Sequence, residues 1–167
     1  MQKKNNQVHA LTHTGIGMMR RIVTPVEITN VITGKIVSTQ GLWDTGATGS
    51  SITKSMASVL GLVSFGKRQV RGVHGVKETE VYYVKITLNN KNITLKAKVT
   101  ECDELSSDNS IGMLIGMNFI TMGDFAITNF QGNTTMSFRV PSLQKIDFVR
   151  APDHIRVLPT DDSEKSA

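Results

Sequence analysis

The chain has 167 residues, of which 39% are hydrophobic and 20% are charged, and its formal net charge is +5 at pH 7. This length predicts one domain, and the composition is that of an ordinary globular protein. No apolar run approaches the roughly 18 residues that span a bilayer, so no membrane association is expected. The N-terminus is polar and lacks the hydrophobic stretch of a secretory signal, which predicts a cytoplasmic protein.

The cysteine, histidine and basic residues argue against disulfide-bonded, metal-binding and nucleic-acid-binding proteins. Cys102 is the only cysteine and the four histidines are scattered, so neither an internal disulfide nor a bound metal or cofactor is expected. Only the net charge would support interpreting the chain as a nucleic-acid-binding β-barrel, because the sequence has no RNA-binding signature. We therefore expect no nucleic-acid partner. We interpret residues 1–21 as a flexible tail, which contains four basic residues, Lys3, Lys4, Arg20 and Arg21.

Clustered or alternating apolar residues predict four strands in the first hundred residues. β-branched residues fill residues 22–32, and a turn at Thr33-Gly34 leads into a second strand over residues 35–43. Residues 84–88 and 93–99 alternate apolar with polar side chains, which is typical of half-buried strands.

Two short helices are expected between the strands. Residues 51–60 carry apolar side chains at helical spacing, with Ser50 or Ser51 available as the N-cap and Gly61 as the stop. A second helix of one or two turns is expected over residues 117–122.

The last part of the chain completes an all-β pattern. A strand begins at Phe125 and returns over residues 135–140 after a turn. Many short strands with little helix predict a barrel or a sandwich, and we expect the domain to span residues 22–140. Residues 141–167 are expected to form a C-terminal extension, which can add an edge strand around residues 146–148 before a disordered end.

One acidic residue directly follows the second predicted strand. The loop that it opens reads Asp44-Thr45-Gly46-Ala47-Thr48-Gly49. Its glycines permit a sharp turn and a close backbone approach, and its hydroxyls can hydrogen-bond the backbone. The pattern predicts a carboxylate at the tip of a stiff loop, although an isolated Asp-x-Gly is also typical of a plain Asx turn.

A glycine-rich tip joins two polar, extended segments. The tip reads Gly72-Val73-His74-Gly75 and lies between residues 66–71 and 76–79. Because neither face of such a hairpin can cover a core, we expect it to project from the body as a mobile flap.

Three segments follow one another in a recognisable order. An apolar strand leads to Asp44-Thr45-Gly46-Ala47, the glycine-rich tip follows, and Leu114-Ile115-Gly116 precedes a short helix. In this order they resemble the retropepsin-like aspartic proteases, in particular the small single-domain cellular forms. The resemblance covers roughly residues 22–140 and implies a closed, barrel-like acid-protease fold that works as a C2 homodimer.

The resemblance also implies roles for individual residues. Asp44 matches the catalytic aspartate, and Thr45 matches the residue whose hydroxyl crosses the dimer axis. Gly46 matches the glycine that lets the substrate backbone approach, and Ala47 completes the active-site loop. Gly116, preceded by Leu114 and Ile115, matches the glycine packed behind this loop. The flap tip that closes over the substrate matches Gly72, Val73, His74 and Gly75.

The sequence contains a single Asp-Thr-Gly. A pair of catalytic aspartates therefore requires a second copy of the chain, related by a twofold axis. We expect an aspartic endopeptidase that dimerises with itself and hydrolyses a peptide or protein substrate. The alternative is a dimeric module on the same fold that binds peptides or partners without cleaving them, because a fold does not fix a function.

Overall fold

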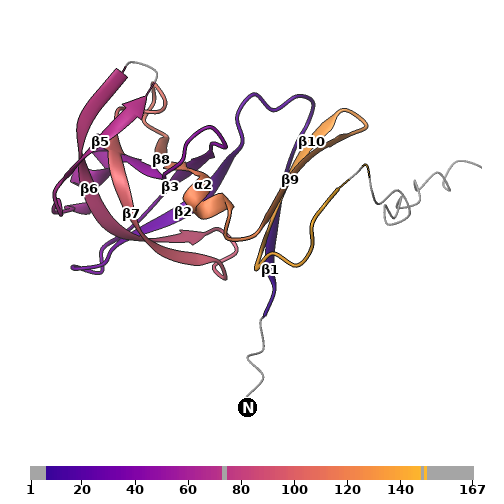
Figure 1. Ribbon diagram of the computed structural model, residues 1–167, viewed down its shortest axis with the longest axis horizontal. Coiled ribbons are helices and arrows are strands. Elements are labelled where there is room, and N and C mark those ends of the chain that lie inside the picture. The colour runs from indigo at the N-terminus through magenta and orange to yellow at the C-terminus, as the bar shows by residue number, and fades with distance from the viewer. Residues whose placement is uncertain (1–6, 73–74, 148, 150–167) are drawn as a thin grey trace, which may run out of the picture.

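The computed structural model describes residues 7–72, 75–147 and 149 of the chain. Within them, ten strands and two short helices form a closed barrel with a three-stranded sheet beside it (Figure 1). The predicted all-β class is confirmed, and the architecture is a barrel rather than a sandwich.

Six strands close the barrel. Their order around it is β2 (Val23–Asn30), β3 (Ile36–Trp43), β8 (Ile111–Ile115), β4 (Ser51–Thr53), β7 (Thr94–Cys102) and β6 (Gly75–Leu88). The ring closes because β2 pairs with both β3 and the second half of β6. The first half of β6 pairs instead with β5 (Lys67–Gly72), which lies outside the ring.

Alternate side chains of the barrel strands fill its interior. On β6, Val84, Ile86 and Leu88 are completely buried, whereas the residues between them are only partly covered. This period of two is the one that the sequence predicts for residues 84–88.

Helix α1 (Lys54–Leu60) begins three residues later than predicted. A cap at Ser50 or Ser51 is wrong, because β4 occupies the segment before the helix and pairs with β7 and β8. Thr53 is the N-cap, and its hydroxyl accepts a backbone N–H of the first turn. Gly61 ends the helix in the left-handed conformation, with φ of 63°, as the sequence predicts.

Helix α2 (Met117–Ile120) follows β8 and is two residues shorter than the predicted segment. Neither helix in the described part of the chain is long enough or apolar enough to cross a membrane.

The three-stranded sheet corrects the prediction for the N-terminus. Its strand order is β1 (His9–Gly15), β10 (Asn133–Val140) and β9 (Asp124–Phe130). A flexible tail over residues 1–21 is therefore wrong for residues 9–15. Leu11 pairs with Phe138 and is buried, so a partner near the other end of the chain stabilises β1.

An aromatic cluster joins this sheet to the barrel. Trp43 ends β3, and its ring lies 5.4 Å from Phe125, 6.1 Å from Phe119 and 5.1 Å from Phe138 between centroids. Its indole N–H donates to the hydroxyl of Thr24 at 2.9 Å. Large buried aromatic groups dominate the energetics of a core, so this cluster fixes the end of β3.

The segment after β10 does not form the edge strand considered from the sequence. Residues 141–147 contain no strand, and Phe148 lies outside the described residues. The end expected to be disordered, from residue 150 onward, is also outside them.

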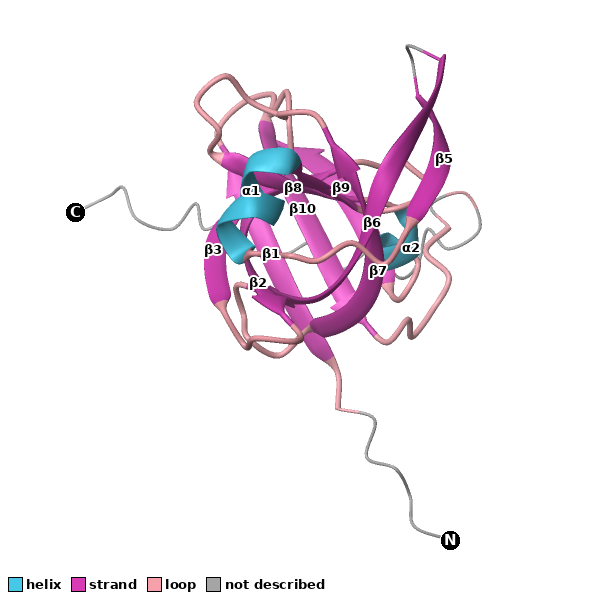
Figure 2. Ribbon diagram, turned by 90° about the vertical axis from the view of Figure 1, so that its left-hand side faces the viewer, coloured by secondary structure: helices cyan, strands magenta, loops and turns pink. Residues whose placement is uncertain are grey.

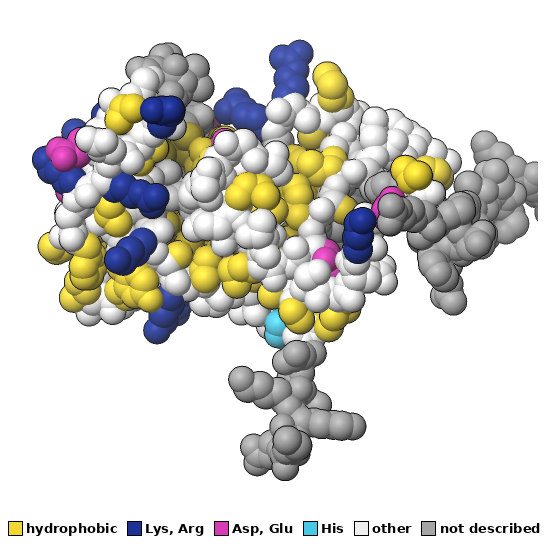
Figure 3. Space-filling view, viewed as in Figure 1, with side chains coloured by type: hydrophobic (Ala, Val, Ile, Leu, Met, Phe, Trp, Pro, Cys, Tyr) yellow, Lys and Arg dark blue, Asp and Glu magenta, His cyan; other side chains and the backbone are white. Residues whose placement is uncertain are grey.

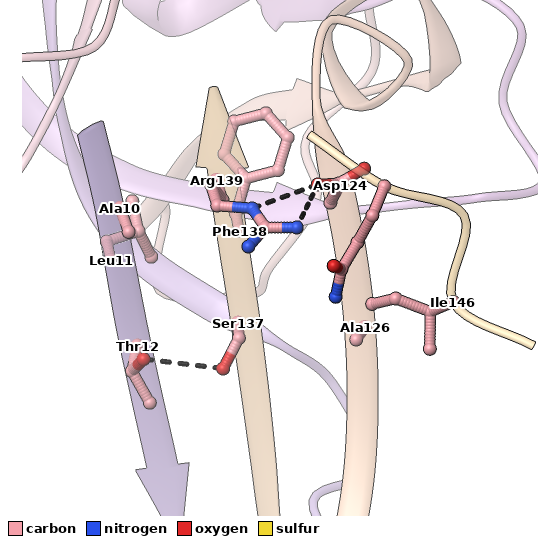
Figure 4. Close-up of a pocket in the computed structure, with 10 residues that line it drawn as sticks. Ala10, Leu11, Thr12, Asp124, Ala126, Ser137, Phe138, Arg139 and Ile146 are labelled. Carbon is pink, nitrogen blue, oxygen red and sulfur yellow. Dashed lines mark hydrogen bonds and ion pairs between the residues drawn. The ribbon is translucent and has the colours of Figure 1, made fainter. Parts of the chain in front are cut away.

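Hydrogen bonds to Asp124 tie this segment to β9. The carboxylate accepts bonds from the Ser142 hydroxyl at 2.5 Å, the Leu143 backbone N–H at 3.0 Å and Arg139 Nε at 2.9 Å. Figure 4 shows the Arg139 contact beside a shallow pocket of about 240 Å³ between the segment and the sheet. The hydrogen bond from Ser142, followed by those from Leu143 and Arg139, lowers the pKa of Asp124 to about 2.

We expect Asp124→Asn to lower the melting temperature at neutral pH. The folded-state pKa of about 2 lies below the ordinary value of 3.8, so the charged carboxylate stabilises the fold at pH values above the ordinary one. This stabilisation is lost as the pH falls through the folded-state pKa. Thermal unfolding of both proteins from neutral pH down to pH ~2 should show a difference that is full above the ordinary value and shrinks below it. A difference that is constant with pH would contradict this account.

Candidate active site

Asp44 is the first residue after β3, where the parallel strands β3 and β8 end side by side. Trp43 pairs with Ile115 across these strands, and the backbone N–H of Asp44 donates to the Ile115 carbonyl at 2.9 Å. The Asp44 side chain is half-buried, and its Oδ1 accepts the backbone N–H of Gly46 at 2.8 Å. The loop therefore has the hydrogen bond of an Asx turn, and this bond orients the carboxylate.

The residues after Asp44 leave the carboxylate uncrowded. A Cβ atom at Gly46 would lie 3.2 Å from Asp44 Oδ1, so a side chain there would press on the carboxylate. Thr45 and Gly46 are exposed and Ala47 is half-buried. The Thr45 hydroxyl has no hydrogen-bond partner among the described residues.

Gly116, directly after β8, packs behind the Asp44 loop. A Cβ atom at this position would lie 2.4 Å from the carbonyl oxygen of Gly49 and 2.8 Å from that of Ala47. Only a residue without a side chain fits here without displacing the loop. Ile115 before it carries the carbonyl that accepts the Asp44 N–H, and Leu114 pairs with Leu42 and Ser51 on either side of the loop.

The start of α2 provides a second support. The backbone N–H of Met117 donates to the Ala47 carbonyl at 2.8 Å, and that of Asn118 donates to the Thr48 carbonyl at 3.1 Å. The first N–H groups of a helix have no partner inside the helix. Here the loop satisfies two of them, which fastens it to α2.

Ser50 is a support residue that the sequence analysis missed, since it was expected only as a possible helix cap. Its side chain is buried, its hydroxyl accepts the backbone N–H of Gly116 at 3.0 Å, and it donates to Asn118 Oδ1 at 2.8 Å. A hydroxyl residue after a glycine-rich loop is visible in the sequence. Its two partners, however, lie far along the chain, so no local pattern identifies them.

The predicted hairpin is present and projects from the barrel (Figure 2). Gly72 pairs with Gly75, and the two tip residues between them, Val73 and His74, lie outside the described residues. Gly75 has φ of 104°, a conformation that favours glycine. Most of the side chains on both arms are exposed, as expected for a hairpin that covers no core. Its role as a substrate flap remains a prediction.

The sequence model of the aspartyl protease family matches residues 25–119, which is more than half of the chain. The chain belongs to the aspartyl protease family. The match includes the Asp44 loop, the hairpin, β8 and most of α2.

The fold is retropepsin-like. It is similar to the crystal structure of a retropepsin-like aspartic protease from Rickettsia conorii, with a TM-score of 0.55 and 16% identity over 84% of this chain and 99% of that chain. The retroviral protease-like domain of Ddi1 from Leishmania major matches with a TM-score of 0.42 and 18% identity, over 78% of this chain and 99% of that chain.

A larger protein also contains a region similar to this chain. The foamy viral protease-reverse transcriptase, solved in complex with an RNA/DNA hybrid, matches with a TM-score of 0.43 and 23% identity over 60% of this chain. The match spans 11% of the length of that viral protein. No curated protein sequence matches the chain. The family and fold predicted from the sequence are confirmed by the family match and the Rickettsia structure.

The space around Gly116 gives a direct test of loop support. We expect Gly116→Ala to destabilise the protein by about 1–3 kcal/mol, because the new methyl group overlaps backbone that has to move. Gly49→Ala is the matched control, since a Cβ atom at Gly49 meets no atom within 4 Å. Urea unfolding of both variants measures the difference. Equal stability of the two would show that Gly116 does not pack behind the loop as described.

Proposed function

We propose that the protein is an aspartic endopeptidase that works as a C2 homodimer and hydrolyses peptide bonds between two Asp44 carboxylates, one from each subunit. The observation that carries the proposal is the Asp44 loop. Its carboxylate is oriented by the Gly46 N–H, and the loop is fastened to β8 and α2 in a chain of the aspartyl protease family.

Dimerisation follows from the chemistry that peptide hydrolysis requires. One group has to remove a proton from the attacking water, and another has to protonate the substrate carbonyl and later the leaving amine. Two adjacent carboxylates can do both, because like charges so close together cannot both ionise and the pair retains one proton. The chain supplies one Asp-Thr-Gly, so a twofold axis beside Asp44 would bring the second carboxylate.

Two exposed features support contact with a second copy. The Thr45 hydroxyl lies on the surface next to Asp44 without a partner among the described residues, so it is available to a residue across the axis. Large apolar side chains are also exposed on the three-stranded sheet and on the connection after β1, at Ile16, Met18, Ile127 and Phe130. Exposed apolar groups mark protein–protein interaction surfaces where they form a contiguous patch, and a second copy packed here would cover them.

The substrate would be an extended peptide beneath the two hairpins. In this arrangement Gly72, Val73, His74 and Gly75 of each subunit close over the bound chain. The peptide would be held mainly through its backbone, in the manner of an added strand. Gly46 would leave room for the substrate backbone beside Asp44, and Ala47 would complete the active-site loop.

Asp44→Asn tests the catalytic role. We expect cleavage of a peptide library to fall by roughly 10²–10⁴-fold, because an amide cannot act as the general base. The fold should persist, since the amide oxygen can still accept the Gly46 N–H. The control is Asp108→Asn, which removes an exposed carboxylate in another loop and should leave cleavage unchanged.

The same assay separates a protease from a binding module. Robust cleavage by purified Asp44→Asn protein would exclude the proposed chemistry. If neither the wild type nor the variant cleaves, and both bind peptides equally, the chain is a non-proteolytic binding module.

A shared site also predicts that activity depends on protein concentration. We expect the specific activity per chain to fall on dilution below the dimer dissociation constant. Adding excess Asp44→Asn chain should inhibit the wild type through mixed dimers, whereas adding excess Asp108→Asn chain should not. Constant specific activity in a solution that sedimentation shows to be monomeric would rule out a site built from two subunits.

A further inference from the structure

We propose that the outer face of β6 and β7 is a docking surface for acidic segments of the protein substrate. Three lysines define this lysine face: Lys85 on β6, and Lys96 and Lys98 on β7. The identity of the ligand as a substrate rests on the proposed protease function, whereas the charge arrangement does not depend on it.

The strand register places the three lysines together. Lys85 is directly opposite Lys96 in the antiparallel pair, and Lys98 follows two residues later on the same face of β7. The next pair on this face, Thr87 and Thr94, brings its hydroxyls to 3.2 Å of each other. Opposed side chains of these strands therefore lie on one outer surface.

This arrangement is unfavourable for the isolated chain. Like charges directly opposite one another destabilise a sheet. None of the three lysines forms an ion pair within the described residues, and Glu27, which lies on the neighbouring strand β2, pairs with Lys91. Figure 3 shows a column of basic side chains over this part of the barrel without acidic side chains among them.

Protection of a sheet edge explains only part of the pattern. β7 pairs with β4 only from Thr100 onward, so its first residues form an edge where lysines can block unwanted strand pairing. Lys85, however, lies on a central strand, opposite Thr29 of β2 on one side and opposite Lys96 on the other. Lys85 has no edge to protect, so edge protection does not account for its charge, and an anionic ligand would offset its repulsion with Lys96.

An acidic polypeptide fits this face best. Lys96 and Lys98 are two residues apart on one strand, about 7 Å, which is also the spacing of alternate side chains in an extended peptide. Carboxylates on one face of such a peptide can meet both lysines. The neighbouring aromatic pair, Phe65 and Tyr83, packs edge to face with a centroid distance of 6.4 Å. Because the two rings pack against each other, they do not form a row of free stacking platforms for the bases of a nucleic acid.

Binding can be measured without cleavage by using full-length Asp44→Asn protein. The probe is a fluorescent peptide of alternating glutamate and glycine, followed by fluorescence anisotropy at low and at physiological salt. We expect Lys85→Gln/Lys96→Gln to weaken binding at least fivefold and to reduce its salt dependence. The control, Lys54→Gln/Lys145→Gln, removes the same charge from α1 and from the C-terminal segment and should bind like the parent protein.

Each outcome decides the proposal. If both double variants weaken binding equally, net charge alone explains the effect, and the lysine face is not a specific site. If neither changes binding, the proposed docking surface is wrong. A thymidine oligonucleotide or phosphatidylserine vesicles can be tested in the same way. If either binds more tightly than the peptide, and Lys85→Gln/Lys96→Gln abolishes that binding, the face is assigned to a nucleic acid or a membrane instead.

Two further readouts keep the test independent of folding and of protease activity. In the absence of ligand, Lys85→Gln should raise the melting temperature slightly, because it removes the repulsion with Lys96; a lower melting temperature would contradict the unfavourable charge pair. In the active protein, Lys85→Gln/Lys96→Gln should raise KM for a substrate with an acidic extension and leave kcat unchanged. Normal cleavage without peptide binding would refute only the lysine face, whereas peptide binding without any cleavage would refute only the protease.

Discussion

The parallel pairing of β3 with β8 is the constraint on which the candidate active site depends. It brings the ends of two strands that are far apart in the sequence to the same edge of the barrel. The hydrogen bond from the Asp44 N–H to the Ile115 carbonyl extends this pairing one residue beyond the ladder. As a result, the loop that carries the carboxylate and the glycine behind it are positioned by the same pair of strands.

The rest of the fold keeps this edge in place. The closed ring of strands leaves β3 and β8 no freedom to separate, and Trp43 anchors the last residue before Asp44 in the aromatic cluster. Ser50 and the start of α2 then satisfy polar groups around the loop. Because buried or half-buried polar groups are costly when unpaired, these bonds favour one loop conformation over others.

The single chain presents surfaces that it does not itself use. The unpartnered Thr45 hydroxyl, the exposed apolar side chains of the three-stranded sheet and the lysine face all lack partners among the described residues. The proposed partner of the first two is a twofold-related chain, and that of the third is an acidic polypeptide. A homodimeric protease would make all of these contacts in one complex, with two hairpins over the peptide and a lysine face on either subunit.

The sequence by itself determined the features that local chemistry controls. The β-branched and alternating segments defined four of the six barrel strands, β2, β3, β6 and β7. Gly61 ended α1. The order of Asp44-Thr45-Gly46, the glycine-rich hairpin and Leu114-Ile115-Gly116 identified the family. Each of these signals is itself only a few residues long, so side-chain period and backbone preference act on it directly. Tertiary structure alone decided that residues 9–15 form a strand, that β4 displaces the start of the helix to Thr53, and that Ser50 braces the loop through Gly116 and Asn118. Each of these depends on a partner strand or a hydrogen-bonding group from a distant part of the chain, and the energy of such a contact leaves no pattern in the local sequence.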